Sequence, residues 1–169
     1  MNTAVYHAIG KNPGYPGLGL PDETGEVFEK VDMLLSSGVS DPDGVADEIG
    51  DVYWYIAALS HELKIDLTEL DGPEAAMDGF VSVPHVSAML VSCKIAGHVK
   101  KIIREGKRGK KYATRVEDIT KLLIELDTLL RMVIRFQTPY TREQVFERNI
   151  NKLSDRKDRG VLHGDGDNR

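Results

Sequence analysis

The sequence predicts an all-α fold: an antiparallel bundle of about five helices in a single domain over residues 1–169. Two observations predict it. Apolar residues recur at spacings of three and four over long stretches, as on one face of a helix. No stretch shows the convincing alternation of apolar and polar residues expected of a half-buried strand. With 169 residues, 41% of them hydrophobic, the chain can bury a core without disulfides.

The first two predicted helices form a hairpin over about residues 17–65. The first helix has Val27, Val31 and Leu34 on one face and is expected to end near Gly38. The second starts at Asp41–Pro42, an N-cap side chain followed by proline at the first helical position. Its apolar stripe consists of Val45, Ile49, Val52, Ile56, Leu59 and Leu63.

A second hairpin is predicted over about residues 84–137. Its first helix runs to about Arg104, and its second starts at Thr114, which has capping-box spacing to Glu117. We expect Cys93 to be buried as a small hydrophobe. The first stripe is Val86, Met89, Leu90, Cys93, Gly97 and Ile102, and the second is Ile119, Leu122, Leu126, Leu129, Leu130 and Val133.

The remaining segments are a fifth helix and two irregular stretches. Thr141 and Gln144 repeat the capping-box spacing and open a helix over about residues 141–157, after Pro139. Residues 66–84 are rich in glycine and proline and are predicted to be a linker. The tail, 158–169, carries three glycines in its last ten residues and is predicted to be loop or flexible.

The two hairpins are interpreted as degenerate repeats at an offset of about 72 residues. "ETGEVFEKV" then aligns with "IAGHVKKII", and Gly25 with Gly97. Glu26 aligns with His98 and Glu29 with Lys101. The second copy would therefore keep the packing positions, including Gly25 and Val27 of the first, and lose the acids.

Composition restricts the function classes. The formal net charge of −5 argues against a general nucleic-acid coat. One basic segment, residues 100–111, is either a solvated turn or a phosphate-steering patch. No signal peptide is apparent, and no apolar stretch approaches the roughly 20 residues that span a bilayer. We therefore expect a cytoplasmic protein without a membrane or stable nucleic-acid partner.

Four acids occur as two pairs on the first hairpin. Glu23 and Glu26 are three positions apart on one helix, and Glu48 and Asp51 are three apart on the next, so each pair faces one way. An antiparallel hairpin can bring both pairs together. The pairs are either two exposed acidic turns or a Mg²⁺ or Mn²⁺ site, since these ions prefer oxygen ligands. Glu48 and Asp51 lie at the edge of an apolar stripe, which favours the metal site.

These motifs resemble a known family. "LGLPDETGEVFEKV", "DEIGDVYWYIAAL" and "NINKLSDRKDRGVLHGDGDNR" are similar to the MazG-like nucleotide pyrophosphohydrolases of the all-α NTP pyrophosphatase superfamily. Their hallmark is E-x-x-E on one helix and E-x-x-D on the next. The resemblance is good over residues 17–65 and 145–169 and poor over 66–140, where this chain inserts the second hairpin.

The resemblance implies a reaction in which a nucleoside triphosphate and water give a monophosphate and pyrophosphate, as in house-cleaning of nucleotide pools. It implies Mg²⁺, with Mn²⁺ as a possible substitute, held by Glu23, Glu26, Glu48 and Asp51. Water acidified by the metal would attack the α-phosphorus, and Glu23 or Glu26 would be the catalytic base. Glu29 is either an auxiliary ligand or a surface acid near Lys30.

The final helix is implied to bind the substrate through one face. Asn149, Lys152 and Arg156 match the family's N-x-x-K-x-x-x-R pattern, with the two cations at phosphate and asparagine nearer sugar or base. Trp54 is either a core residue or a platform for the nucleobase. The tail "HGDGDNR" is either disordered or folds over the phosphates.

Two other functions stay open. One is phosphoribosyl-ATP pyrophosphohydrolase activity, which belongs to the same superfamily. The other is a non-catalytic helical module that binds nucleotides or a protein. Relatives often share the four-helix core between two subunits, so a homodimer is expected.

Overall fold

The computed structural model describes residues 12–70 and 83–159. This part of the chain is all-helical, as the sequence predicted, and contains no strand. Its elements are the helices α1 (Gly14–Ser37), α2 (Pro42–Leu63), α3 (Pro84–Glu105), α4 (Gly109–Gln137) and α5 (Arg142–Asp158), with a short 3₁₀ helix, η1 (Leu67–Leu70). Residues 71–82 of the predicted linker and residues 160–169 of the tail lie outside the described residues.

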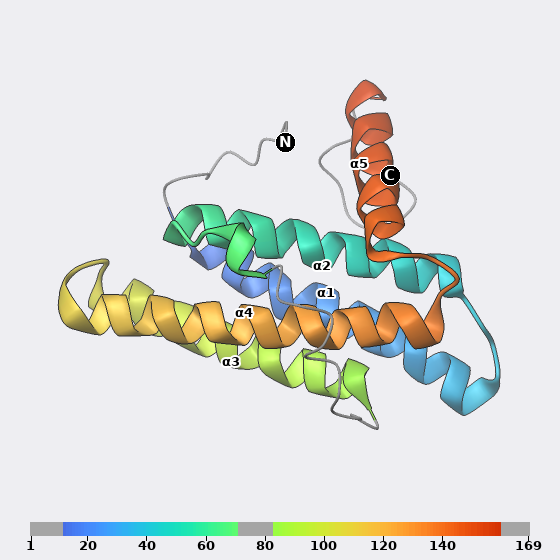
Figure 1. Cartoon of the computed structure of the whole chain (residues 1–169), viewed down its shortest axis with the longest axis horizontal. Helices are drawn as coiled ribbons and strands as arrows, with labels where there is room; N and C mark the ends of the chain where they lie inside the picture. Colours follow the sequence, from blue (N-terminus) through green and yellow to red (C-terminus); the bar gives the residue numbers. More distant parts are fainter. Residues whose placement is uncertain (1–11, 71–82, 160–169) are drawn as a thin grey trace.

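Two helical hairpins, α1–α2 and α3–α4, pack side by side along the long axis of the molecule (Figure 1). Helix α1 contacts α3, and α2 contacts α4. Helix α5 runs across the long axis of the bundle and projects from it, and its main contact with the bundle is α2 (Figure 1). The face of α2 that carries Glu48 and Asp51 therefore lies between α1 and α5.

The caps explain where several helices begin and end. Asp41 accepts a hydrogen bond from the Gly44 amide at 2.9 Å and starts α2. Gly38 ends α1 with a φ of 71°, a left-handed conformation that glycine adopts at little cost. Thr141 and Gln144 form the predicted capping box and start α5. All three predicted signals are confirmed.

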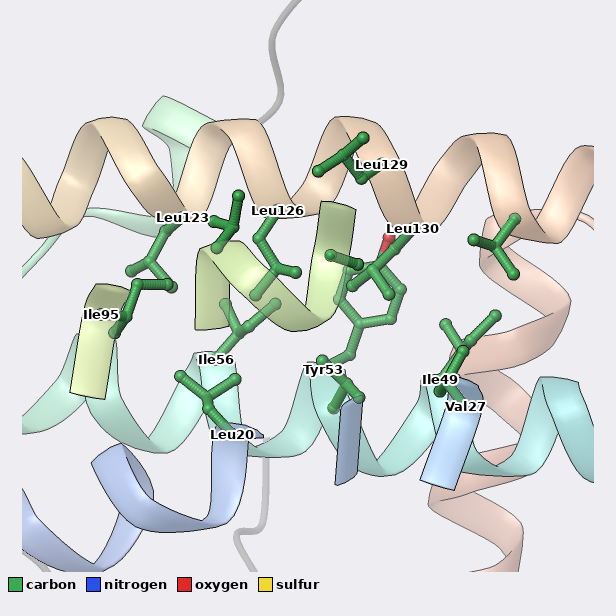
Figure 2. Packing of buried hydrophobic residues seen from close by; sticks show 14 of the residues in the cluster. Leu20, Val27, Ile49, Tyr53, Ile56, Ile95, Leu123, Leu126, Leu129 and Leu130 are labelled. Carbon is green, nitrogen blue, oxygen red and sulfur yellow. The ribbon is translucent and has the colours of Figure 1, made fainter. Parts of the chain in front are cut away.

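The core lies between the hairpins and is built from aliphatic side chains of all four long helices. Figure 2 shows Leu20 and Val27 of α1 close to Ile49 and Ile56 of α2, with leucines of α4 opposite. The burial pattern of α2 recurs on α4 74 residues later, in the pairs Val45 and Ile119, Ile49 and Leu123, Val52 and Leu126, Ile56 and Leu130, and Leu59 and Val133. The hairpins thus use equivalent helix faces.

On α1 and α3 the buried positions correspond at a different offset. Leu20, Thr24, Val27 and Val31 have counterparts 68 residues later in Ala88, Ser92, Ile95 and Val99. The two hydroxyl groups of one such pair, Thr24 and Ser92, lie 2.6 Å apart inside the bundle. At this offset Glu26 corresponds to Lys94, whereas the offset of 72 residues paired it with His98. Neither residue is acidic, so the second hairpin lacks this acid under both alignments.

Three details of the sequence prediction are wrong. Helix α3 buries Ala88, Val91, Ile95, Val99 and Ile102, while Leu90 and Cys93 of the predicted stripe are exposed. Both faces of α3 carry apolar residues, and periodicity alone does not tell which one meets α1 and α4.

Helix α4 begins at Gly109, five residues before the predicted start at Thr114. The Thr114 hydroxyl donates to the Lys110 carbonyl inside the helix, as threonine side chains within helices often do, and does not cap it. Gly25 and Gly97 are not packing positions, because a Cβ at either would meet no atom within 4 Å.

A buried carboxylate fixes the start of α5. Asp127 of α4 accepts hydrogen bonds from the Tyr53 hydroxyl at 2.9 Å and Arg131 Nε at 2.8 Å, and lies 2.9 Å from Arg142 Nη2. The Arg142 guanidinium also lies over the Tyr53 and Phe146 rings. Asp127 thereby joins α2, α4 and α5, and no feature of the sequence analysis pointed to it.

We expect Asp127→Ala to destabilise the fold by about 3 kcal/mol, because it leaves two arginines without their buried counter-charge. Urea unfolding followed by circular dichroism measures this. Glu117→Ala is the control, because it removes an exposed ion pair with Lys121 and should change the free energy of unfolding by less than about 0.5 kcal/mol. Equal effects of the two substitutions would contradict a structural role for Asp127.

Candidate metal centre

Three of the four predicted acids meet in space. One carboxylate oxygen from each of Glu23, Glu26 and Glu48 lies within 4.8 Å of the other two. Glu26 is exposed, Glu23 is partly buried and Glu48 is only 2% exposed. The packing of α1 on α2 brings them together, because Val27 and Ile49, next to two of these acids in the sequence, are both core residues.

Asp51 lies beside this group rather than within it. Its charge, with those of Glu26, Glu48 and Asp22, helps to raise the pKa of Glu23, after burial as the largest cause. Together these effects raise the pKa of Glu23 to about 8. Asp51 itself accepts a hydrogen bond from Asn149 Nδ2 at 2.6 Å and contacts Lys152 Nζ at 2.5 Å. The predicted face of α5 therefore meets the predicted acids.

Gly50 permits the close contact between α2 and α5. A Cβ at this position would lie 2.8 Å from the Cβ of Asn149, closer than side-chain atoms normally approach. Asn149 is buried against this backbone, where its amide can reach Asp51. A second contact lies on the same side of α2, where Arg148 Nη2 is 2.9 Å from Asp47 Oδ1.

Arg156, Trp54 and Glu29 are the remaining predicted site residues. Arg156 is buried on α5, but among the described residues no hydrogen bond or ion pair joins it to the four acids. Trp54 is half-buried and meets Tyr55 edge to face, with ring centroids 4.9 Å apart. Glu29 is exposed and outside the group of three acids, and the neighbouring Lys30 pairs with Glu48 and Asp41.

Sequence reasoning missed two residues beside the acids. Tyr55 feels the charges of Glu23 and Asp51, which with burial, the largest cause, and its hydrogen bond to Tyr15 raise its pKa. The Lys30 ammonium lies 3.3 Å from Glu48 Oε1. A signal for Lys30 was present, since it is four positions after Glu26 and so shares a helix face with it.

The donor set fits a hard divalent cation. All the candidate ligand atoms are carboxylate oxygens, which Mg²⁺ and Mn²⁺ prefer. Holding several carboxylates this close in a partly buried place is unfavourable without positive charge, as the raised pKa of Glu23 indicates. Glu23, Glu26 and Glu48 could therefore hold a metal ion, with Asp51 next to them.

Comparison with known proteins finds a phage relative. The Gene 37 protein of Mycobacterium phage L5 is 40% identical to this chain in an alignment of 118 residues that covers 63% of this chain and all of the phage protein. The chain belongs to the family of this phage protein. No family model and no solved structure matches the chain. In the described residues, no helix combines the length and the apolarity needed to cross a bilayer.

We expect Gly50→Ala to destabilise the protein and weaken the contacts of Asn149 and Lys152 with Asp51, because the added methyl group pushes α5 from α2. Helix propensity alone would predict the opposite, a gain of up to about 1 kcal/mol. Gly25→Ala is the matched control: it adds the same methyl group where no atom lies within 4 Å and should stabilise. Thermal unfolding of both variants measures the difference, and a stabilised Gly50→Ala would refute the close approach.

We expect the affinity for Mg²⁺ to rise with pH up to about 8 and then level off, because the metal binds the ionised Glu23 carboxylate and displaces its proton. In the metal-free protein, the contribution of Glu23 to folding stability is greatest below about pH 4.5, the pKa of this group in the unfolded chain. That contribution is lost as the pH rises towards 8, the pKa in the folded protein.

Calorimetric titrations at several pH values, in buffers of different ionisation enthalpy, measure both the affinity and the released proton. In Glu23→Gln the proton release should disappear. A wild-type affinity that does not change between pH 6 and 8 would contradict the displacement of a proton from Glu23 by the metal.

Proposed function

We propose that this chain is a Mg²⁺-dependent nucleoside triphosphate pyrophosphohydrolase of the MazG-like type, converting a (d)NTP to the (d)NMP and pyrophosphate. The observation that carries the proposal is the meeting of two separate motifs. Asn149 and Lys152 of α5 contact Asp51 of the acidic hairpin, although they are about 100 positions away in the sequence. An acid cluster beside a lysine and an amide suits a metal-bound triphosphate.

The chain's own residues would divide the work. Glu26 is exposed at the cluster and can accept the proton of the attacking water, while Glu23 and Glu48 would hold the metal ion. Once a metal ion neutralises Asp51, the Lys152 ammonium group can pair with a phosphate oxygen instead. Asn149 can orient the substrate. Mg²⁺, when bound, supplies positive charge to the triphosphate and acidifies water.

The reaction balances without another reactant. A water oxygen forms a bond to the α-phosphorus while the bond from that phosphorus to the α,β-bridging oxygen breaks. The electron pair of that bond leaves with pyrophosphate, and a carboxylate takes the water proton. Trp54 and Tyr55 lie on the next turn of α2 after Asp51, where a nucleobase could stack on an aromatic ring.

The proposal includes a homodimer acting on the nucleotide pool of the cytoplasm. Support for the dimer comes from α3, whose second apolar face bears the exposed Leu90 and Cys93 beside the open surface at Gly97. A second subunit that covers Leu90 and Cys93 would remove these apolar side chains from water.

Pyrophosphate release from each NTP and dNTP, and from phosphoribosyl-ATP, tests the proposal and its closest alternative in one panel. We expect turnover that requires Mg²⁺ or Mn²⁺ and falls by about 10²-fold or more in Glu26→Gln and in Asp51→Asn. Lys121→Ala, an exposed position on α4, is the control and should keep full activity. Absence of turnover across the panel would favour a non-catalytic binding module instead.

A further inference from the structure

A cation supplied by the chain itself lies against the most deeply buried acid of the cluster. Lys30 Nζ is 3.3 Å from Glu48 Oε1 and 3.5 Å from Asp41 Oδ2. The Lys30 side chain is 24% exposed, while that of Glu48 is 2% exposed. The ammonium group is therefore held between α1 and the first turns of α2, on the solvent side of Glu48.

The backbone leaves room for this ammonium group. At Gly44, a Cβ would lie 2.9 Å from Lys30 Nζ and 2.0 Å from Asp41 Oδ2. Any larger residue would displace the lysine, the aspartate or both. Asp41 is held in place by its hydrogen bond from the Gly44 amide, so the N-cap of α2 is also one wall of the place that Lys30 occupies.

A lysine and a divalent cation that use the same carboxylate oppose each other. Glu48 is one of the three acids whose oxygens lie close enough to share a metal ion. A positive charge 3.3 Å from one of its oxygens repels an incoming ion and already satisfies part of the negative charge that would attract it. The lysine and the metal ion therefore weaken each other's interaction with Glu48 by the same factor.

We propose that Lys30 is an internal counter-ion of the metal centre, which neutralises Glu48 when no metal is bound and competes with the metal for that carboxylate. This inference rests on the proposed function, because it requires the acid cluster to bind a divalent cation. Lys30 is a positioning and regulating residue here, since it acts on the substrate only through the metal centre. It keeps the buried glutamate tolerable in the metal-free protein and limits how tightly metal is held.

Removing Lys30 affects the metal affinity differently under this role than under the other roles that a lysine could have at this place. A lysine that only ties α1 to α2 would stabilise the protein equally with and without metal. A lysine that binds phosphate would leave the metal affinity of the nucleotide-free protein unchanged or nearly so. An internal counter-ion, when removed, destabilises the metal-free protein and tightens the binding of metal.

The test is a calorimetric titration of the metal-free protein with Mn²⁺ in the absence of nucleotide. We expect Lys30→Met to lower the Kd for Mn²⁺ by roughly tenfold and Lys30→Arg to leave it close to the wild-type value. Lys111→Met, which removes the same charge from an exposed position in the first turn of α4, is the control and should not change it. Thermal unfolding should show a larger rise on adding Mn²⁺ for Lys30→Met than for wild type.

The outcomes separate this inference from the proposed function. Wild-type protein that binds no Mn²⁺ at millimolar concentrations would overturn the metal centre and this inference with it. Wild-type protein that binds Mn²⁺, with equal or weaker binding in Lys30→Met, would overturn the role of Lys30 alone. If Lys30→Met does not fold, Lys30→Gln keeps a hydrogen-bond donor without the charge and is read by the same criteria.

Discussion

Mutual repulsion between carboxylates, enforced by the packing of α1 on α2, is the constraint on which the rest of the site depends. Val27 and Ile49 belong to the core, and their burial fixes the neighbouring Glu26 and Glu48 close to each other and to Glu23. The hydrophobic effect thus supplies the free energy that holds like charges together. Burial, and after it the charges of the neighbouring acids, raises the pKa of Glu23, and positive charge from the chain or from a metal would offset the repulsion.

Helix α5, from a different part of the chain, brings a positive charge and an amide group to the acids. It supplies Lys152 and Asn149 to Asp51, and two features bring it there: the absence of a side chain at Gly50 and the buried charge network around Asp127. Both features act on α5 near its N-terminal half. The site is therefore assembled from one hairpin that concentrates negative charge and one crossing helix that compensates part of it.

Much of the fold could be predicted from sequence because its signals are local. The capping side chains Asp41 and Thr141 and the glycine at Gly38 mark helix ends through contacts within a few residues. The same holds for the acid pairs, since i and i+3 positions share a helix face in any context. Prediction failed at α3, where Leu90 and Cys93 are exposed, because both faces of that helix are apolar and only its neighbours select one.

By itself, the sequence determined that the chain is all-helical, where most helices end, and that Glu23, Glu26, Glu48 and Asp51 form two pairs with a common direction. Only the tertiary structure decided which charges compensate them. Lys30 resembles an ordinary polar helix residue in sequence. The family pattern marked Asn149 and Lys152 as substrate-binding residues but not as partners of Asp51, and all three contacts are set by how α1, α2 and α5 pack. The physical reason is range: helix propensity and capping act over one or two turns, whereas Asn149 and Asp51 are 98 residues apart and meet only after the helices pack.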